Sequence, residues 1–113
     1  MWGEFETVYA VTDYVDAILA GVADFEGSPH VFVLERLDGT LYRLTPVTGG
    51  AVPSLTSSPA RDMWKPTPAI EGLVRAAVTL QGGGFLVQGE FSPARRSASK
   101  KPALRVRWKR DGV

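Results

Sequence analysis

The basic residues near the end of the chain are the first candidates for chemistry. Residues 94–110, ARRSASKKPALRVRWKR, contain eight basic residues and no acidic one. Guanidinium and ammonium groups neutralise phosphates, and small β-barrels bind RNA or single strands with a basic groove and stacking aromatics. The stretch therefore predicts an anion-binding or nucleic-acid-binding surface, with the candidate residues Arg95, Arg96, Lys100, Lys101, Arg105, Arg107 and Lys109.

The last of these basic residues alternate with apolar ones. Leu104, Val106 and Trp108 alternate with Arg105, Arg107 and Lys109, which predicts a strand over 103–110. The cations then lie on one face at ~7 Å spacing, and Trp108 points into the core. A solvated loop beside the outer face of a half-buried sheet gives the same pattern, and charges also protect an edge strand from aggregation. Both interpretations stay open.

Acidic residues in the first third of the chain are the second candidates. Asp13 and Asp16, together with His30, are residue types that hold hard cations or perform acid/base catalysis. A local alternative is a short helix capped by Asp13 and ended by Gly21. The chain has no cysteine and one histidine, so no spaced His/Cys metal set exists. We expect a protein that is not an enzyme and that uses no metal or cofactor.

Met63 and Trp64 form the third candidate site. They lie in RDMWKPTP, residues 61–68, where flanking cations and an aromatic ring are typical of a partner anchor. The alternative is that Trp64 covers one open end of the folded domain.

Composition narrows the class of protein. The 113 residues are 44% hydrophobic and 22% charged, which predicts a single folded domain over 1–113. The first residues, MWGEFETVYAV, contain two Glu and no basic residue, unlike a signal peptide. No apolar run approaches the ~20 residues of a membrane-spanning helix. We expect a cytoplasmic protein with no membrane partner.

Charge is distributed unevenly along the chain. Residues 1–40 contain eight acidic residues and one arginine, whereas residues 92–113 contain eight basic residues and one aspartate. If these halves face opposite ways, the surface has an acidic and a basic pole. The poles predict nucleic acid or an acidic protein as partner, or a homo-oligomer assembled through the complementary halves.

Short β-rich runs must position these residues. We expect strands over 5–12, 21–27, 30–37, 85–91 and 103–110, and a hairpin over 36–47 with Asp38-Gly39 as a type I′ turn. We expect residues 48–69, rich in Pro, Gly and Ser, to form a long loop, and residues 92–102 to form a flexible basic loop.

Residues 70–80 fit two patterns. Ile70, Leu73, Val74, Ala77 and Val78 form a helical stripe, while apolar residues at 74, 76, 78 and 80 alternate as in a strand. The glycines at 82–84 resemble a turn before a return strand, which favours a strand over 73–80, with one short helix near 70–80 as the alternative. The fold class is mainly all-β, a small antiparallel barrel or sandwich of six to seven short strands.

Three motifs in the first half resemble a group of small bacterial proteins with no assigned activity. They are TDYVD at 12–16, GVADFEGSPHVF at 21–32 and YRLTPV at 42–47. The resemblance implies a β-hairpin opening, with an ordered turn rather than a helix over 13–21 and with structural roles for the Tyr, Asp, Pro and His of the motifs. The chain departs from the group at AILA, 17–20, where the group has a Gly-Pro-type turn, and at 70–110, where the group looks helical and Trp-rich.

The favoured function is a small non-enzymatic binding module that takes single-stranded nucleic acid or RNA on its basic C-terminal strand and loop. The alternative is a protein-interaction or inhibitor domain, of the immunity or phage type, that uses both charged poles. A more remote alternative is a metal-dependent enzyme at Asp13, Asp16 and His30.

Overall fold

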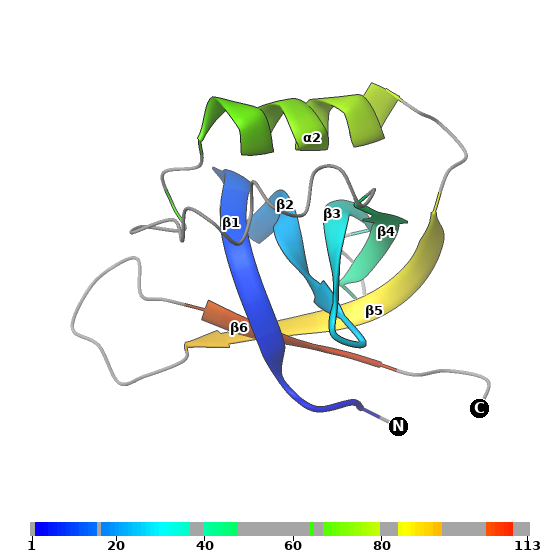
Figure 1. Cartoon of the computed structure of the whole chain (residues 1–113). Helices are drawn as coiled ribbons and strands as arrows, with labels where there is room; N and C mark the ends of the chain where they lie inside the picture. The colour runs from blue at the N-terminus through cyan, green and yellow to red at the C-terminus, as the bar shows by residue number, and fades with distance from the viewer. Residues whose placement is uncertain are drawn as a thin grey trace.

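The strands of the protein form a closed antiparallel barrel. A computed structural model describes residues 2–15, 17–36, 40–47, 64, 67–79, 84–93 and 104–109. The barrel has the strand order β1-β2-β3-β4-β5-β6, which confirms the expected small antiparallel barrel (Figure 1). Its elements are β1 (Glu6–Val15), β2 (Ala17–Phe25), β3 (Ser28–Arg36), β4 (Leu41–Pro46), α2 (Pro68–Thr79), β5 (Phe85–Pro93) and β6 (Leu104–Trp108).

Strand β5 closes the barrel because it pairs with two neighbouring strands. Its first residues, from Phe85 to Gln88, pair with β4, and the residues from Gly89 to Pro93 pair with β6. β6 then pairs with the start of β1 at Glu6 and Thr7. In Figure 1, β5 curves around the barrel and β5 and β6 cross below the other strands. This arrangement brings the two ends of the sequence into one three-stranded surface.

The interior of the barrel is an aromatic core. Trp108, Phe32 and Leu44 are its largest fully buried side chains. Strand alternation directs them inward, as expected for Val106 and Trp108 of β6. Gly89 lies against Trp108, where an added Cβ would be 2.4 Å from the indole ring. The absence of a side chain at Gly89 therefore makes room for the tryptophan.

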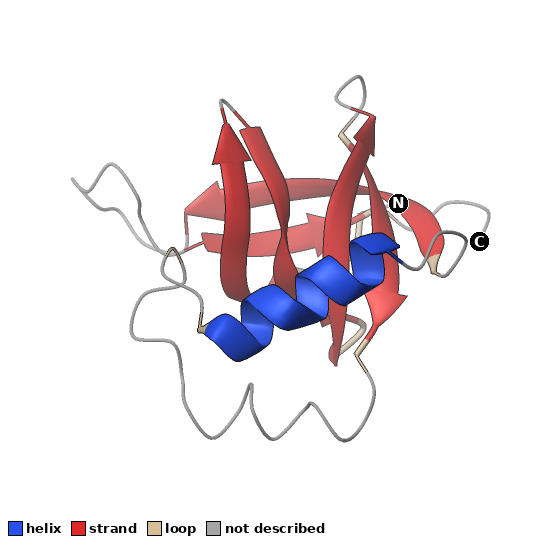
Figure 2. Cartoon of the chain, turned by 90° about the horizontal axis from the view of Figure 1, so that it is seen from above, coloured by secondary structure: helices blue, strands red, loops and turns tan. Residues whose placement is uncertain are grey.

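Helix α2 forms a second layer, and the expected strand over 73–80 is wrong. Ile70 and Val74 are buried against the outer faces of β1–β3, and Leu73 and Ala77 pack beside them. Figure 2 shows the helix lying across these strands. Val78, one of the alternating apolar residues on which the expected strand rested, is 54% exposed. The helical stripe was therefore the correct pattern in this segment.

A cap at Thr67 explains why the helix forms there. The backbone N–H of Ile70 donates to Thr67 Oγ1 at 3.3 Å, and Pro68 occupies the first helical position. Glu71 in the first turn interacts favourably with the helix dipole. Among the described residues, no helix is long and apolar enough to cross a lipid bilayer.

The short helix considered as an alternative over residues 13–21 is not formed. This segment forms the two arms of the β1–β2 hairpin, with Tyr14 paired to Ile18 and Val11 paired to Gly21. Shifts of register in β1 twist the strand, so that it contributes to both the barrel interior and the surface under α2. Local capping signals at Asp13 were overridden by strand pairing.

The hairpin expected over 36–47 is present as β3 and β4. Its proposed turn, Asp38-Gly39, lies outside the described residues, as do most of the loop over 48–69 and most of the basic loop over 92–102.

Candidate functional site

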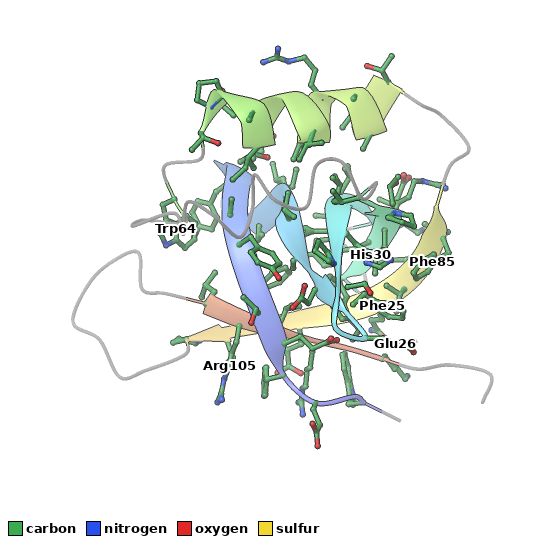
Figure 3. The ribbon with its side chains drawn as sticks, viewed as in Figure 1. Phe25, Glu26, His30, Trp64, Phe85 and Arg105 are labelled. Carbon is green, nitrogen blue, oxygen red and sulfur yellow. The ribbon has the colours of Figure 1, made fainter. Side chains whose placement is uncertain are left out.

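The two faces of β6 differ as the alternation predicts. Val106 and Trp108 are fully buried in the barrel, while Arg105 is exposed and Arg107 is partly exposed. Figure 3 shows Arg105 projecting away from the barrel on the side opposite α2. The cations of β6 therefore lie on an outward face.

Three cross-strand rows make up this outward face. Arg105 pairs with Thr7 of β1 and Ser92 of β5, and Arg107 pairs with Glu90 of β5. Lys109 is bridged to Trp2 and donates its backbone N–H to the carbonyl of Gln88. Directly opposite residues in antiparallel strands project to the same side of a sheet. We name the three rows the Arg105 row (Thr7, Arg105, Ser92), the Arg107 row (Arg107, Glu90) and the Lys109 row (Trp2, Lys109, Gln88).

Aromatic rings that the sequence interpretation overlooked lie beside the cations. The Arg105 guanidinium carbon lies 4.3 Å from the centroid of the Phe5 ring. The Arg107 guanidinium carbon lies 5.1 Å from the Trp2 ring and 5.2 Å from the Phe5 ring. Such cation–π contacts contribute about 0.5–1 kcal/mol each at exposed sites. The outward face therefore combines cations with Phe5 and Trp2.

Arg107 is also paired with a carboxylate. Its Nε and Nη2 donate to Glu90 Oε2 at 3.0 and 2.7 Å. The two side chains are 34% and 48% exposed. A pair this exposed adds about 0–1 kcal/mol to stability, but it neutralises the charge of Arg107 locally.

Acidic residues gather beside this face, around the β2–β3 turn. Glu4, Phe5, Glu6 and Glu26 line a shallow depression. Glu6 Oε1 accepts a hydrogen bond from the backbone N–H of Gly27 at 2.7 Å. Glu6 is paired to the inward-facing Val106, so its side chain starts on the side of β1 opposite Thr7. The acidic side chains therefore border the outward face at Phe5 and are not part of the Arg105 row.

Several predicted site residues lie outside the described residues. They are Arg95, Arg96, Lys100 and Lys101 of the basic loop, Met63 of the expected anchor, and Asp16 of the acidic set. Of the basic stretch, the structure brings together Arg105, Arg107 and Lys109.

Trp64 lies at one end of the barrel. Its ring contacts the ring of Tyr14 edge-on, with centroids 5.4 Å apart, and it packs against the barrel core. It is half-buried, while Tyr14 is 51% exposed. These contacts favour the interpretation of Trp64 as a cover of the barrel end.

His30 lies at the opposite end of the barrel, with Phe25 and Phe85 (Figure 3). Its ring is buried, and the Phe25 and Phe85 centroids are 5.6 and 5.8 Å away. Nδ1 lies 2.7 Å from the carbonyl oxygen of Ser28, so this nitrogen donates. Asp13, by contrast, is exposed next to Tyr14 at the Trp64 end. The structure does not bring Asp13 and His30 together.

The described residues contain no group of three or more His, Cys, Asp or Glu side chains placed to hold a metal ion.

The raised pKa values of two tyrosines predict a loss of stability at alkaline pH. Burial raises the pKa of Tyr42 to about 12, and its hydroxyl donates to the carbonyl of Ile18 at 3.0 Å. The pKa of Tyr9 is also raised to about 12, by burial first and then by the hydrogen bond and negative charge of Asp24.

In the unfolded chain these hydroxyls ionise near pH 10.0, whereas the folded chain keeps them protonated up to about pH 12. Their contribution is fully present below about pH 10 and is lost as the pH rises through about 12. Urea unfolding between these pH values should show the free energy of unfolding fall as the pH rises. Tyr42→Phe should make this fall shallower. Equal slopes for the two proteins would contradict the burial of Tyr42.

No known protein family, curated protein or solved structure matches the chain. Its function is therefore inferred from the geometry of the outward β6 face and the charges around it.

Proposed function

We propose that this protein is a small non-enzymatic binding module that holds single-stranded nucleic acid, DNA or RNA, on the outward face of β6. The observation that carries the proposal is the exposed guanidinium of Arg105 lying 4.3 Å over the Phe5 ring. A guanidinium in this position can offer its N–H groups to phosphate and its other face to a base.

The rigidity of the face supports the proposal. Arg105 and Arg107 project from a paired strand whose other side is the buried core. Sites on strands hold their side chains more closely in place than sites on loops, so less rotamer entropy is lost on binding. The flanking Phe5 limits the rotamers of both arginines further.

The distribution of acids is also compatible with a polyanion. Glu6 is hydrogen-bonded to the β2–β3 turn, and Glu26 lies in that turn beside the same depression. Thr7 and Ser92, which flank Arg105, are uncharged. A nucleic-acid strand bound along the Arg105 row therefore passes beside these carboxylates rather than over them.

The test is fluorescence polarisation with labelled single-stranded DNA, single-stranded RNA and duplex DNA, at low and at moderate salt. We expect the single strands to bind with an affinity that falls steeply with salt, because each neutralised phosphate releases counterions. Arg105→Glu/Arg107→Glu should weaken binding at low salt by more than about tenfold, since it places negative charge on the face.

The matched control is Arg36→Glu/Arg75→Glu, which changes the charge equally at two exposed cations of β3 and α2. It should lose much less affinity than the β6 variant. Circular dichroism and thermal melting of both variants show whether they are folded. Equal losses in the two variants, or no binding by the wild type at low salt, would refute the proposal.

A protein partner is the second candidate, and the mixed charge around the face favours it. The acidic depression of Glu4, Glu6 and Glu26 directly borders Phe5, which contacts both arginines. A protein surface with both signs of charge complements such a border better than a polyanion does. This candidate predicts an interaction-domain or inhibitor role, with loss of binding on charge reversal at Glu4 and Glu26 as well as at Arg105.

The basic loop residues Arg95, Arg96, Lys100 and Lys101 are proposed as additional phosphate contacts. A cytoplasmic location and self-association through the charged poles stay predictions from the sequence.

A further inference from the structure

The two arginines of β6 have different surroundings, although they alternate identically in the sequence. Arg107 donates twice to Glu90 and contacts the rings of Trp2 and Phe5. Arg105 contacts Phe5, and within the described part of the chain no carboxylate pairs with it.

The surroundings of Arg107 disfavour the binding of a phosphate at its guanidinium. A phosphate at this guanidinium has to displace Glu90 or accept its negative charge at close range. Like charges side by side oppose each other, and the donors Nε and Nη2 are already used. Arg107 instead holds Phe5 and Trp2 in place by its cation–π contacts.

The Arg105 row has the composition of a phosphate subsite. Thr7 and Ser92 are the cross-strand partners of Arg105 on its two sides. Directly paired residues have Cβ atoms about 4.5–5.5 Å apart and face the same way, so the two hydroxyls lie on either side of the base of the Arg105 side chain. The row presents five guanidinium N–H donors and two hydroxyl donors on the same side of the sheet, with no acidic member.

We infer that the outward β6 face takes one phosphodiester of single-stranded nucleic acid, at the Arg105 row, and that Arg107 is a positioning residue held out of contact by Glu90. This inference rests on the proposed function. The guanidinium edge of Arg105 and the hydroxyls of Thr7 and Ser92 donate to the phosphate oxygens. The guanidinium plane that faces away from Phe5 stacks on the adjacent base.

The test uses the salt dependence of binding to a fluorescein-labelled single strand of about 12 nucleotides, within the usual site size of small barrels. Each phosphate contact contributes about 0.7 to the slope of log affinity against log salt for single strands. Four proteins are compared: the wild type, Arg105→Gln, Glu90→Gln, and the charge-neutral double variant Arg107→Gln/Glu90→Gln. Thermal melting checks that each of them is folded.

Arg105→Gln should weaken binding about tenfold and reduce the slope by about 0.7. The double variant removes the cation–π contacts that hold Phe5 and Trp2, so its affinity should fall by about threefold. Its slope should stay that of the wild type, because no phosphate contact is lost. Glu90→Gln releases Arg107 and should tighten binding, with a slope larger by about 0.7.

Other results would contradict the inference, the proposed function or both. If the wild type binds but the double variant loses as much slope as Arg105→Gln, Arg107 contacts phosphate and the inference is wrong while the proposed function stands. If Arg105→Gln binds like the wild type, the subsite is elsewhere. Tighter binding of poly-glutamate than of the oligonucleotide assigns the face to an acidic protein, and absence of any binding by the wild type overturns both proposals.

Discussion

Replacing Trp108 by alanine is expected to lower the free energy of unfolding by about 3–5 kcal/mol, the usual loss for a large aromatic removed from a core. The side chain is 2% exposed. Its ring lies within 6.4 Å, centroid to centroid, of four others, those of Phe25, Phe32, Tyr42 and Phe91. Its Nε1–H also donates to the carbonyl of Asp24 at 2.8 Å, so truncation leaves that oxygen without this donor.

Urea unfolding followed by circular dichroism measures this loss. Trp2→Ala is the control, because Trp2 is a partly exposed tryptophan on the outward face, and it should cost less than about 1 kcal/mol. Trp108→Phe separates the two contributions, since it keeps a ring and removes the hydrogen bond, at a cost of about 1–3 kcal/mol. A Trp108→Ala variant as stable as Trp2→Ala would contradict the closed aromatic core.

The core and the outward face are connected through β6. Trp108 lies between Arg107 and Lys109 in a strand of five residues, so its burial fixes which way both cations project. If the strand loses this anchor, Arg105 and Arg107 lose their register against Phe5, Thr7 and Glu90. A folded Trp108→Phe variant should therefore keep its oligonucleotide affinity, since the ring still anchors the strand.

Strand alternation was the most informative pattern in the sequence. It predicted the buried Val106 and Trp108 and the outward Arg105 because β6 has one face in the core and one in solvent, as alternation requires. The same test failed at residues 73–80, where Ala76 and Val78 continue an apolar alternation but are exposed on a helix. There the decisive signal was Thr67-Pro68, a cap and a first-turn proline, which local periodicity does not measure.

The composition of the candidate site depended on contacts that a local pattern does not contain. Phe5 and Arg105 are a hundred residues apart and meet because β1 pairs with β6 to close the barrel. Glu90 neutralises Arg107 through the pairing of β5 with β6. Barrel closure is a property of the whole chain, so the sequence indicated the cations but not the partners that distinguish them.

Gly21→Ala is expected to destabilise the protein by at least about 3 kcal/mol, because the barrel has no space for a side chain there. A Cβ at this position would be 2.2 Å from the carbonyl oxygen of Ala10 and 2.7 Å from Cζ of Phe32. The first of these atoms is backbone of the paired strand β1, and the second belongs to a fully buried ring. Neither can move without opening the β1–β2 pairing or displacing the core.

The control is the same substitution on the exposed face of the helix. A Cβ at Gly72 meets nothing within 4 Å, and Gly72 lies inside α2, so Gly72→Ala should stabilise the protein by about 0.5–1 kcal/mol. The two variants differ in position alone, and urea unfolding should therefore give changes of opposite sign. If both substitutions were stabilising, Gly21 would not lie against Ala10 and Phe32, and the close packing of β2 against β1 and the core would be contradicted.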